Sequence, residues 1–204
     1  MDGDFKSSHE REPQDPDTLL MSRFAAGDGR AFDELFQRNA ARVYRMAFRF
    51  VGRPDDANDV VQEAFLRVLL ARSTWTPRAK FSTWLYRIVV NLCLNELRRR
   101  KAISWVSLDA PVAEEAGEPP APLPTADTCH AGHLLLKRER VAAVREAVQS
   151  LPADQRMAVV LHRYEGLSYK EIAQAMGRSV SSVESLLHRA KQTLREKLRP
   201  WVGD

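Results

Sequence analysis

The chain has 204 residues, enough for one or two small domains that each bury a modest core. Its 31 basic and 27 acidic residues leave a net charge of only +4, but the charges are segregated, and basic patches of this kind favour nucleic acid as a partner. Two cysteines exclude a disulfide scaffold, and with no long apolar stretch and no signal sequence we expect a cytoplasmic protein without membrane insertion.

The first residues and the middle of the chain differ in composition from the rest. Residues 1–17 carry six Asp and Glu residues against two Lys and Arg residues, which predicts a disordered acidic tail. Prolines and carboxylates crowd residues 107–127 without one basic side chain, which predicts a flexible linker over 104–133. Helical periodicity dominates 18–103 and 134–204, without sustained strand-like alternation. We therefore predict an all-α fold of two small helical domains joined by an acidic, proline-rich linker.

A first informative helix is predicted from Pro54 to Leu69. Its apolar residues recur at helical spacing and indicate a core face made of Val60, Val61, Ala64, Phe65, Val68 and Leu69. The opposite face is acidic and carries an exposed leucine, which favours docking onto a partner protein, although a solvated helix surface explains the same residues. A distant alternative is an aspartate-rich magnesium site formed by Asp55, Asp56, Asp59 and Glu63. A second acidic motif, which such an enzyme needs, is absent.

A second helix is predicted from about Phe81 to Lys101, and its sides differ in chemistry. One side is apolar and carries Leu85, Ile88, Val89 and Leu92. Another side has the stacking, amide and cationic groups that suit an unstacked nucleic-acid strand, namely Trp84, Arg87, Asn91, Asn95 and Arg98. The preceding loop is polar and cationic and adds Trp75 and Lys80. These features favour single-stranded DNA, but both tryptophans also fit an interpretation as core aromatics.

The two cysteines have different settings. Cys93 lies in the apolar helical pattern and is predicted to be a reduced, packed thiol. Cys129 and His130, with His133 nearby, suggest a regulatory metal site, but three such residues without a clear fourth do not complete one. We therefore expect neither a metal nor another cofactor.

Residues 167–191 hold the most informative pattern, two short amphipathic helices separated by a tight turn at Gly177, as in a DNA-binding helix-turn-helix. Ser168 and Glu171 predict a capping box, and Gly177 can end the first helix in a left-handed conformation. The second helix has a predicted core stripe of Val183, Leu187, Ala190 and Leu194. Its outward stripe is polar and short-chained, as a helix in the major groove requires, and consists of Ser181, Ser185, His188 and Gln192. A solvated helical hairpin is the alternative interpretation.

In chain order, these segments resemble three motifs of the extracytoplasmic-function sigma factors of bacterial RNA polymerase. Residues 55–67 resemble the family's helix that binds core polymerase, and residues 81–91 resemble its segment that reads and melts the minus-10 element. Residues 151–173 resemble the start of its domain that reads the minus-35 element. The resemblance covers nearly everything outside the tail and linker, and it implies a sigma factor, not an enzyme.

The resemblance assigns roles to three groups of residues and to both domains. The core-polymerase-binding group is Asp56, Asp59, Gln62, Glu63, Leu66 and Arg67. The minus-10 group is Trp75, Lys80, Trp84, Arg87, Asn91, Asn95 and Arg98. The minus-35 group is Arg178, Ser181, Ser182, Glu184, Ser185, His188 and Arg189. Residues 18–103 would then form sigma region 2 and residues 134–204 sigma region 4.

The resemblance implies core RNA polymerase and promoter DNA, as duplex and as nontemplate single strand, as partners. It also implies an anti-sigma factor, because we expect no sensor domain in this chain.

In the recognition helix Glu184 stands where the family often has a cation. Glu184 either reads a base or forms a capping box with Ser181, which would make Ser179 irrelevant as a cap. The competing function is a two-domain helix-turn-helix regulator of duplex DNA, which would not need the Trp75 loop or the acidic face.

Overall fold

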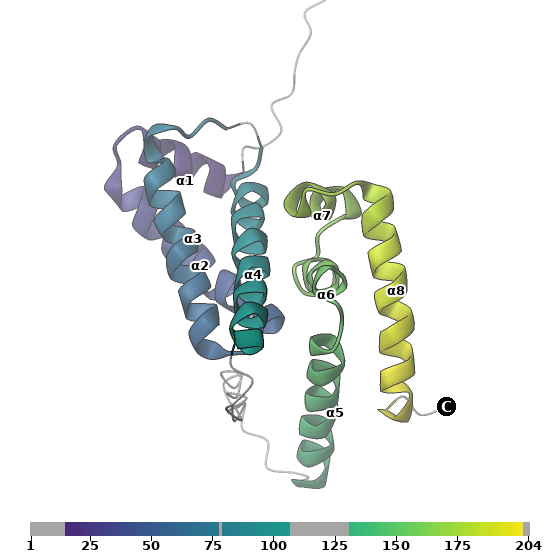
Figure 1. The fold of residues 1–204 in the computed structure, drawn as a ribbon. Coiled ribbons are helices and arrows are strands. Elements are labelled where there is room, and N and C mark those ends of the chain that lie inside the picture. The colour runs from purple at the N-terminus through teal and green to yellow at the C-terminus, as the bar shows by residue number, and fades with distance from the viewer. Residues whose placement is uncertain (1–14, 78, 107–130, 202–204) are drawn as a thin grey trace, which may run out of the picture.

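The computed structural model describes residues 15–77, 79–106 and 131–201, and in 104–106 and 131–137 it describes the backbone alone. The predicted acidic tail and most of the predicted linker lie outside these ranges. Every regular element in the described part is helical, which confirms the predicted fold class (Figure 1). No helix in the described ranges combines the length and the hydropathy that crossing a bilayer requires.

The helices fall into an N-terminal and a C-terminal group. The N-terminal group contains α1 (Pro16–Ala25), α2 (Gly29–Val51), α3 (Pro54–Leu70), the short turn η1 (Ala71–Ser73) and α4 (Phe81–Val106). The C-terminal group contains α5 (Ala131–Gln149), α6 (Ala153–Val159), the π-helical turn η2 (Val160–Tyr164), α7 (Tyr169–Met176), α8 (Val180–Leu198) and η3 (Arg199–Trp201).

Local sequence signals set the ends of the N-terminal helices. The Asp15 carboxylate accepts from the Thr18 amide at 3.3 Å and caps α1, with Pro16 in the first turn. Asp28 caps α2 in the same way. Gly52 ends α2 with a φ of 83°, a left-handed conformation that glycine adopts without a steric penalty. Pro54 then starts α3 after a very short connection.

The N-terminal core lies between α2 and the three helices around it. Met21 of α1, Leu35 and Phe50 of α2 and Val68 of α3 are fully buried there, together with Phe81 at the start of α4. Helix α2 packs on α1, α3 and α4, so the long helix is the axis of this group. The arrangement fixes the outer faces of α3 and α4 on a rigid support.

The C-terminal group contains the predicted helix-turn-helix. Ser168 and Glu171 form the predicted capping box at the start of α7, and Gly177 ends this helix with a φ of 62°. Helix α8 packs on α6 and α7 and buries Val183, Leu186 and Ala190. The predicted core stripe missed Leu186, which is buried, whereas Leu187 and Leu194 are only partly buried and Leu187 packs against the core. Leu186 lies one turn from both Val183 and Ala190, which places it on the same face.

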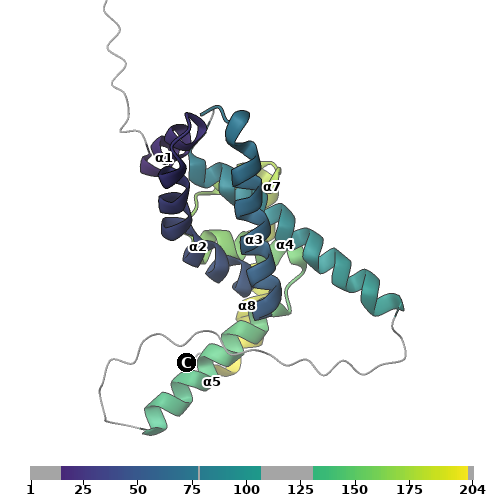
Figure 2. The same cartoon turned by 90° about the vertical axis from the view of Figure 1, so that its left-hand side faces the viewer.

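The two groups of helices lie against each other, which the sequence analysis did not predict. Figure 1 shows α4 between the other N-terminal helices and the C-terminal helices α6 and α7, and Figure 2 shows the same packing from the side. Helix α2 also contacts α5 and η2. Buried residues of both groups, such as Phe50 and Ile172, belong to one continuous apolar cluster.

Candidate partner and nucleic-acid interfaces

The outer face of α3 presents most of the residues predicted to bind a partner protein. Asp59, Gln62, Leu66 and Arg67 are exposed, and Glu63 is partly exposed. Arg67 donates from its Nε to the Glu63 carboxylate at 2.9 Å, a surface pair one turn apart that adds little to stability. The outer face of α3 is therefore exposed to solvent and carries both acidic and basic groups.

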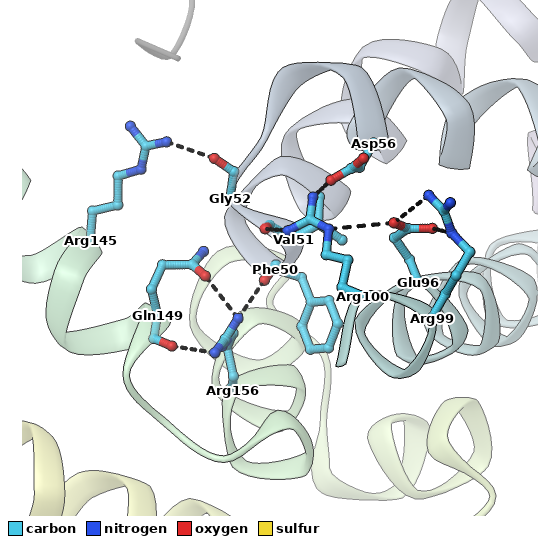
Figure 3. A network of polar contacts seen from close by, with 10 residues as sticks. All are labelled: Phe50, Val51, Gly52, Asp56, Glu96, Arg99, Arg100, Arg145, Gln149 and Arg156. Atoms are coloured by element: carbon cyan, nitrogen blue, oxygen red, sulfur yellow. Dashed lines mark hydrogen bonds and ion pairs between the residues drawn. The ribbon is translucent and has the colours of Figure 1, made fainter. Parts of the chain in front are cut away.

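Asp56 is the exception in this group. The prediction that it faces outward is wrong, because its side chain is only 13% exposed and pairs with Arg100 of α4. Arg100 also donates to the Val51 carbonyl at 3.1 Å and lies 3.4 Å from Glu96 (Figure 3). Asp56 therefore ties the start of α3 to α4. Its partner is 44 positions away in the chain, so no local pattern could have revealed the pair.

Leucines extend the exposed face of α3 beyond the predicted residues. Leu69, predicted in the core, is 45% exposed, because the buried stripe follows Val60, Ala64 and Val68 and the next residue is turned about 100° away. Leu70 is 70% exposed and follows Leu66 by one turn. We use the term docking face for Asp59, Gln62, Glu63, Leu66, Arg67 and Leu70. Acidic groups at one end and leucines at the other suit a protein partner.

The predicted stacking tryptophans belong to an aromatic cluster. The ring of Trp75 lies edge-on to Trp84 at 5.0 Å between centroids, and at 6.1 Å from Phe81. Phe81 is buried, whereas both tryptophans are partly exposed. The buried Trp75 Nε1 has no hydrogen-bond partner among the described residues. The two tryptophan rings thus pack on the core, as core aromatics do, and also leave part of their surface exposed to solvent, as stacking on a base requires.

The polar side of α4 forms a continuous exposed ridge next to this cluster. Arg87, Asn91, Asn95 and Arg98 are all exposed, as is Lys80 before the helix. Arg98 donates to the Asn95 amide oxygen at 2.8 Å, which orients that amide. We call Trp84, Arg87, Asn91, Asn95 and Arg98 the α4 ridge. Its amides, cations and aromatic ring match the groups with which proteins hold unstacked bases and phosphates.

The outward stripe of α8 is exposed as predicted at Ser181, Ser185, His188 and Gln192. A shallow hollow in this stripe is lined by Glu184, Ser185, His188 and Arg189. Arg189 donates to the Ser185 carbonyl at 3.2 Å, and the His188 and Gln192 side chains lie 3.1 Å apart. These contacts stay within the helix, so the polar groups remain accessible from outside.

The cap of α8 decides between the two interpretations of Glu184. Ser179 is the N-cap, and its hydroxyl accepts from the Ser182 amide at 3.2 Å. Glu184 therefore lies in the second turn, where a capping box with Ser181 cannot form, and that alternative is wrong. Its carboxylate is exposed. Arg178, in contrast, pairs with Asp154 of α6 at 2.5 Å, which ties the turn to the rest of the C-terminal helices.

Other candidate chemistry finds no support among the described residues. Cys129 and His130 lie outside them, and the side chain of His133 is not described. No group of three metal-ligating side chains occurs in the described part of the chain. Cys93 is fully buried, as predicted, and burial raises the pKa of its thiol, so it stays protonated.

Two family profiles match the chain. The profile described as Sigma-70 region 2 matches residues 35–103, which include α3, the Trp75 loop and most of α4. The profile described as Sigma-70, region 4 matches residues 142–194, which include the helix-turn-helix. The resemblance noted in the sequence is thus found independently in both groups of helices.

Curated relatives span nearly the full chain. An ECF RNA polymerase sigma factor SigE of Mycolicibacterium smegmatis is 37% identical over 95% of this chain and 73% of its own length. The RNA polymerase sigma-H factor of Pseudomonas aeruginosa is 35% identical, over 94% of this chain and 98% of its own. The ECF RNA polymerase sigma-E factor of Escherichia coli K12 is 34% identical, with 91% and 96% covered.

Solved structures show the same fold. The structure titled CnrH in complex with the cytosolic domain of CnrY has 26% identity and a TM-score of 0.65, and the match covers 90% of this chain and 97% of that one. The sigma factor RpoE of Bartonella quintana, solved with the anti-sigma factor NepR, has 23% identity and a TM-score of 0.65, with 82% and 96% covered. At this identity the second match speaks for the fold alone.

Proposed function

The chain belongs to the extracytoplasmic-function group of the sigma-70 family, and from this premise we propose how its surfaces divide the work of promoter recognition. A sigma factor is a non-catalytic subunit of RNA polymerase that directs initiation at promoters. In our proposal the docking face binds core polymerase, the Trp75 loop and α4 ridge recognise and open the minus-10 element, and α8 recognises the minus-35 element. The observation that carries this is the exposure of three chemically distinct surfaces on separate helices.

For core polymerase, we propose contact through the docking face. Its leucines Leu66 and Leu70 are large apolar groups on an outer surface, where burial against a partner is favourable. Its acidic groups Asp59 and Glu63 would set the orientation of that contact through charge complementarity. Asp56 takes a positioning role instead, because its pair with Arg100 holds α3 against α4.

For the minus-10 element, the proposed sequence of events is capture of an unpaired base by the aromatic cluster, followed by tracking of the strand along the α4 ridge. Unpairing and unstacking one base costs a few kcal/mol, and stacking on an aromatic side chain returns about 1–3 kcal/mol per base. The partly exposed rings of Trp75 and Trp84 supply such a surface. Cations along the ridge add phosphate contacts, so strand capture requires no ATP.

For the minus-35 element, the exposed stripe of α8 enters the major groove in the manner of other helix-turn-helix proteins. Ser181, Ser185 and Arg189 offer donors to bases and phosphates. Glu184 is free of any capping role and accepts well from the N4 amino group of cytosine. We propose that this carboxylate distinguishes the upstream sequence of this protein from that of relatives with a cation there.

Regulation by an anti-sigma factor is part of the proposal. CnrH, which the match covers over 97% of its length, was solved with the cytosolic domain of CnrY. We propose a comparable inhibitory protein for this chain, acting in the cytoplasm where RNA polymerase and promoter DNA are found. Binding of a proteinaceous inhibitor would compete with polymerase for the free chain.

Reconstitution of a holoenzyme tests the function directly. Core polymerase with the purified chain should start RNA at a defined position on a promoter selected from a random library, and core polymerase alone should not. The alternative of a duplex-binding regulator predicts specific binding to DNA without polymerase and no defined start. Transcripts that are the same with and without the chain would contradict the proposal.

A further inference from the structure

Helix α4 takes an N-terminal cap from another helix. The first backbone N–H groups of a helix have no partner within the helix and need acceptors from elsewhere. The residue before α4 is Lys80, whose ammonium group can only donate hydrogen bonds. The acceptor comes from α1 instead, because the Phe81 amide donates to the Thr18 hydroxyl at 2.8 Å. Helix α1 therefore caps α4 across 63 positions of the chain.

The Thr18 hydroxyl is held in one orientation by the carboxylate of Asp15. Thr18 donates its hydroxyl hydrogen to Asp15 Oδ2 at 2.8 Å, and the same oxygen accepts from the Thr18 amide at 3.3 Å. Because this hydrogen is committed to the carboxylate, the hydroxyl oxygen is left to accept from the Phe81 amide. Asp15 thus caps α1 directly and α4 through Thr18.

Helix α1 also holds the segment before the Trp75 loop, the connection between η1 and α4. Arg72 in η1 donates from its Nε to the Phe24 carbonyl, near the carboxyl end of α1, at 3.1 Å. Its guanidinium carbon lies 5.3 Å from the centre of the buried Phe24 ring. A cation at a helix carboxyl end also interacts favourably with the helix dipole. Helix α1 accordingly packs on both η1 and α4 (Figure 1).

Both ends of the Trp75 loop are therefore fixed on one short helix. Thr18 and Phe24 are six residues apart, which is about 9 Å along α1. A loop whose two ends are held at a set spacing has fewer conformations than a loop held at one end. The contacts of α1 thus restrict the conformations of the loop that carries Trp75.

Helix α1 is in turn anchored to α2, the axis of the N-terminal group. Asp17 accepts from Arg38 Nε at 2.7 Å and from the Asn39 side-chain amide at 2.9 Å. Asn39 is only 6% exposed and also donates to the Leu35 carbonyl at 3.1 Å. On the apolar side of α1, Met21 is fully buried. The helix that holds the loop therefore has a rigid base of its own.

The residue that Thr18 holds is part of the aromatic cluster. The Phe81 ring is fully buried and lies 6.1 Å from the Trp75 ring and 5.9 Å from the Trp84 ring. A shift of the Phe81 backbone would move the surface on which both partly exposed tryptophans pack. A binding site works only when such groups are held close to their productive geometry. Thr18 thus acts on Trp75 through one intervening ring.

We propose that Thr18 and Arg72 are positioning residues for strand capture, which hold the two ends of the Trp75 loop on α1 so that the Trp75 ring is in place before a base arrives. This inference rests on the proposed function of the loop, but the bracing itself is a property of the free chain. A loop already held in its binding conformation loses less freedom when it binds. Loosening either end should weaken binding of an unpaired strand and leave recognition of duplex DNA by α8 unchanged.

Two substitutions loosen the loop at one end each. Thr18→Val keeps the side-chain shape without the hydroxyl, and Arg72→Met keeps an apolar stem without the guanidinium. Thr18→Ser should restore wild-type behaviour, because it keeps the hydroxyl. Ser22→Ala is the control for Thr18→Val, since Ser22 lies one turn further along α1 and its hydroxyl donates to the Thr18 carbonyl. Arg23→Met is the control for Arg72→Met, since Arg23 is a cation of α1 that pairs with Asp28.

A nitroxide label in the loop measures the bracing without polymerase or DNA. The label is attached to Thr76→Cys, an exposed position, in a chain that also carries Cys129→Ser, while Cys93 is fully buried and stays unlabelled. Paramagnetic resonance spectra should show a more mobile label in Thr18→Val and Arg72→Met than in the wild type, Thr18→Ser and both controls. Equal mobility in all these chains would overturn the bracing.

Holoenzymes made with core polymerase test the consequence for DNA. Affinity for a promoter fragment with an unpaired minus-10 nontemplate strand is divided by affinity for a fragment that ends in the upstream duplex. This ratio should fall roughly fivefold in Thr18→Val and Arg72→Met, as for the loss of one hydrogen bond, and stay at the wild-type value in Thr18→Ser and the controls. A more mobile label with an unchanged ratio, or an equal loss of affinity for both fragments, would overturn the positioning role. If the wild-type ratio shows no preference for the unpaired strand, the proposed function fails, while the label still decides the bracing.

Discussion

Replacing Glu184 by Lys should change the upstream sequence that the protein selects while leaving its fold intact. Because Ser179 is the N-cap, Glu184 lies in the second turn of α8, outside the first turn where helix-dipole effects are concentrated. Its carboxylate is exposed and has no cap to maintain. The substitution should therefore change the free energy of unfolding by less than about 0.5 kcal/mol, as surface changes usually do.

The effect on recognition should be larger than the effect on stability. A favourable side-chain contact to one base pair is worth about 1–3 kcal/mol of discrimination, which corresponds to a preference of roughly 5-fold to 150-fold at that position. Loss of the carboxylate should remove a preference for cytosine at one upstream position. The added lysine also gains a phosphate contact, so overall affinity should rise at low salt and depend more steeply on salt concentration.

Selection from a randomised upstream element, performed with both holoenzymes at one salt concentration, measures the change. Ser179→Ala is the matched control, since loss of an N-cap costs about 1 kcal/mol and should lower the melting temperature by about 2–4 °C without changing the selected sequence. Identical sequence logos for the wild type and Glu184→Lys would refute the reading role. A uniform loss of promoter use with a lowered melting temperature would indicate a structural role instead.

Three further outcomes are expected. Asp59→Arg combined with Glu63→Arg should abolish binding to core polymerase in a pull-down while circular dichroism stays unchanged, and normal binding would remove α3 from that interface. Trp75→Ala should weaken strand capture by about 1–3 kcal/mol, which reduces the permanganate-reactive open complex roughly 5-fold or more. Binding to upstream duplex DNA should change little. An equal loss of open complex and of duplex binding would indicate a purely structural tryptophan. Hydrogen bonds from Ser168 lower the pKa of Glu171 below its usual 4.5. The ionised Glu171 therefore contributes stability above that pH, and this contribution is lost as the pH falls through the lowered pKa. Glu171→Gln should remove this part of the acid dependence, and a pH profile of the melting temperature equal to that of the wild type would contradict the prediction.

Features that depend on a few neighbouring residues were predictable from the sequence. The capping box at Ser168 and the left-handed turn at Gly177 follow from residue types at fixed spacing, and the structure confirms both. The cap of α8 was ambiguous because Ser179 and Ser181 both have suitable partners downstream. The serine that caps the helix is determined by the position at which the helix starts. Burial of Val183 and Leu186, in a helix that packs on α6 and α7, fixes that starting position.

Features that depend on distant segments were not predictable in the same way. Asp56 fits an outward acidic face by periodicity, but Arg100 binds it from another helix. Tyr86 has the spacing of a buried helical position, yet its contact with Glu165 becomes visible only in the folded chain, because Glu165 lies 79 positions away. The assignment of the docking face and of the α4 ridge to particular partners remains a prediction.

The way in which α2 is completed has a consequence for synthesis on the ribosome. The side chains of Gln149, Arg156 and Arg145 donate to the carbonyls of Arg49, Phe50 and Gly52, which leave the exit tunnel long before these donors exist. At translation rates of about 5–20 residues per second, the helix end stays without these partners for about 5–20 s. During that interval the carboxyl end of α2 lacks these donors, so a chaperone or polymerase meets a form of the N-terminal helices that the finished chain no longer displays.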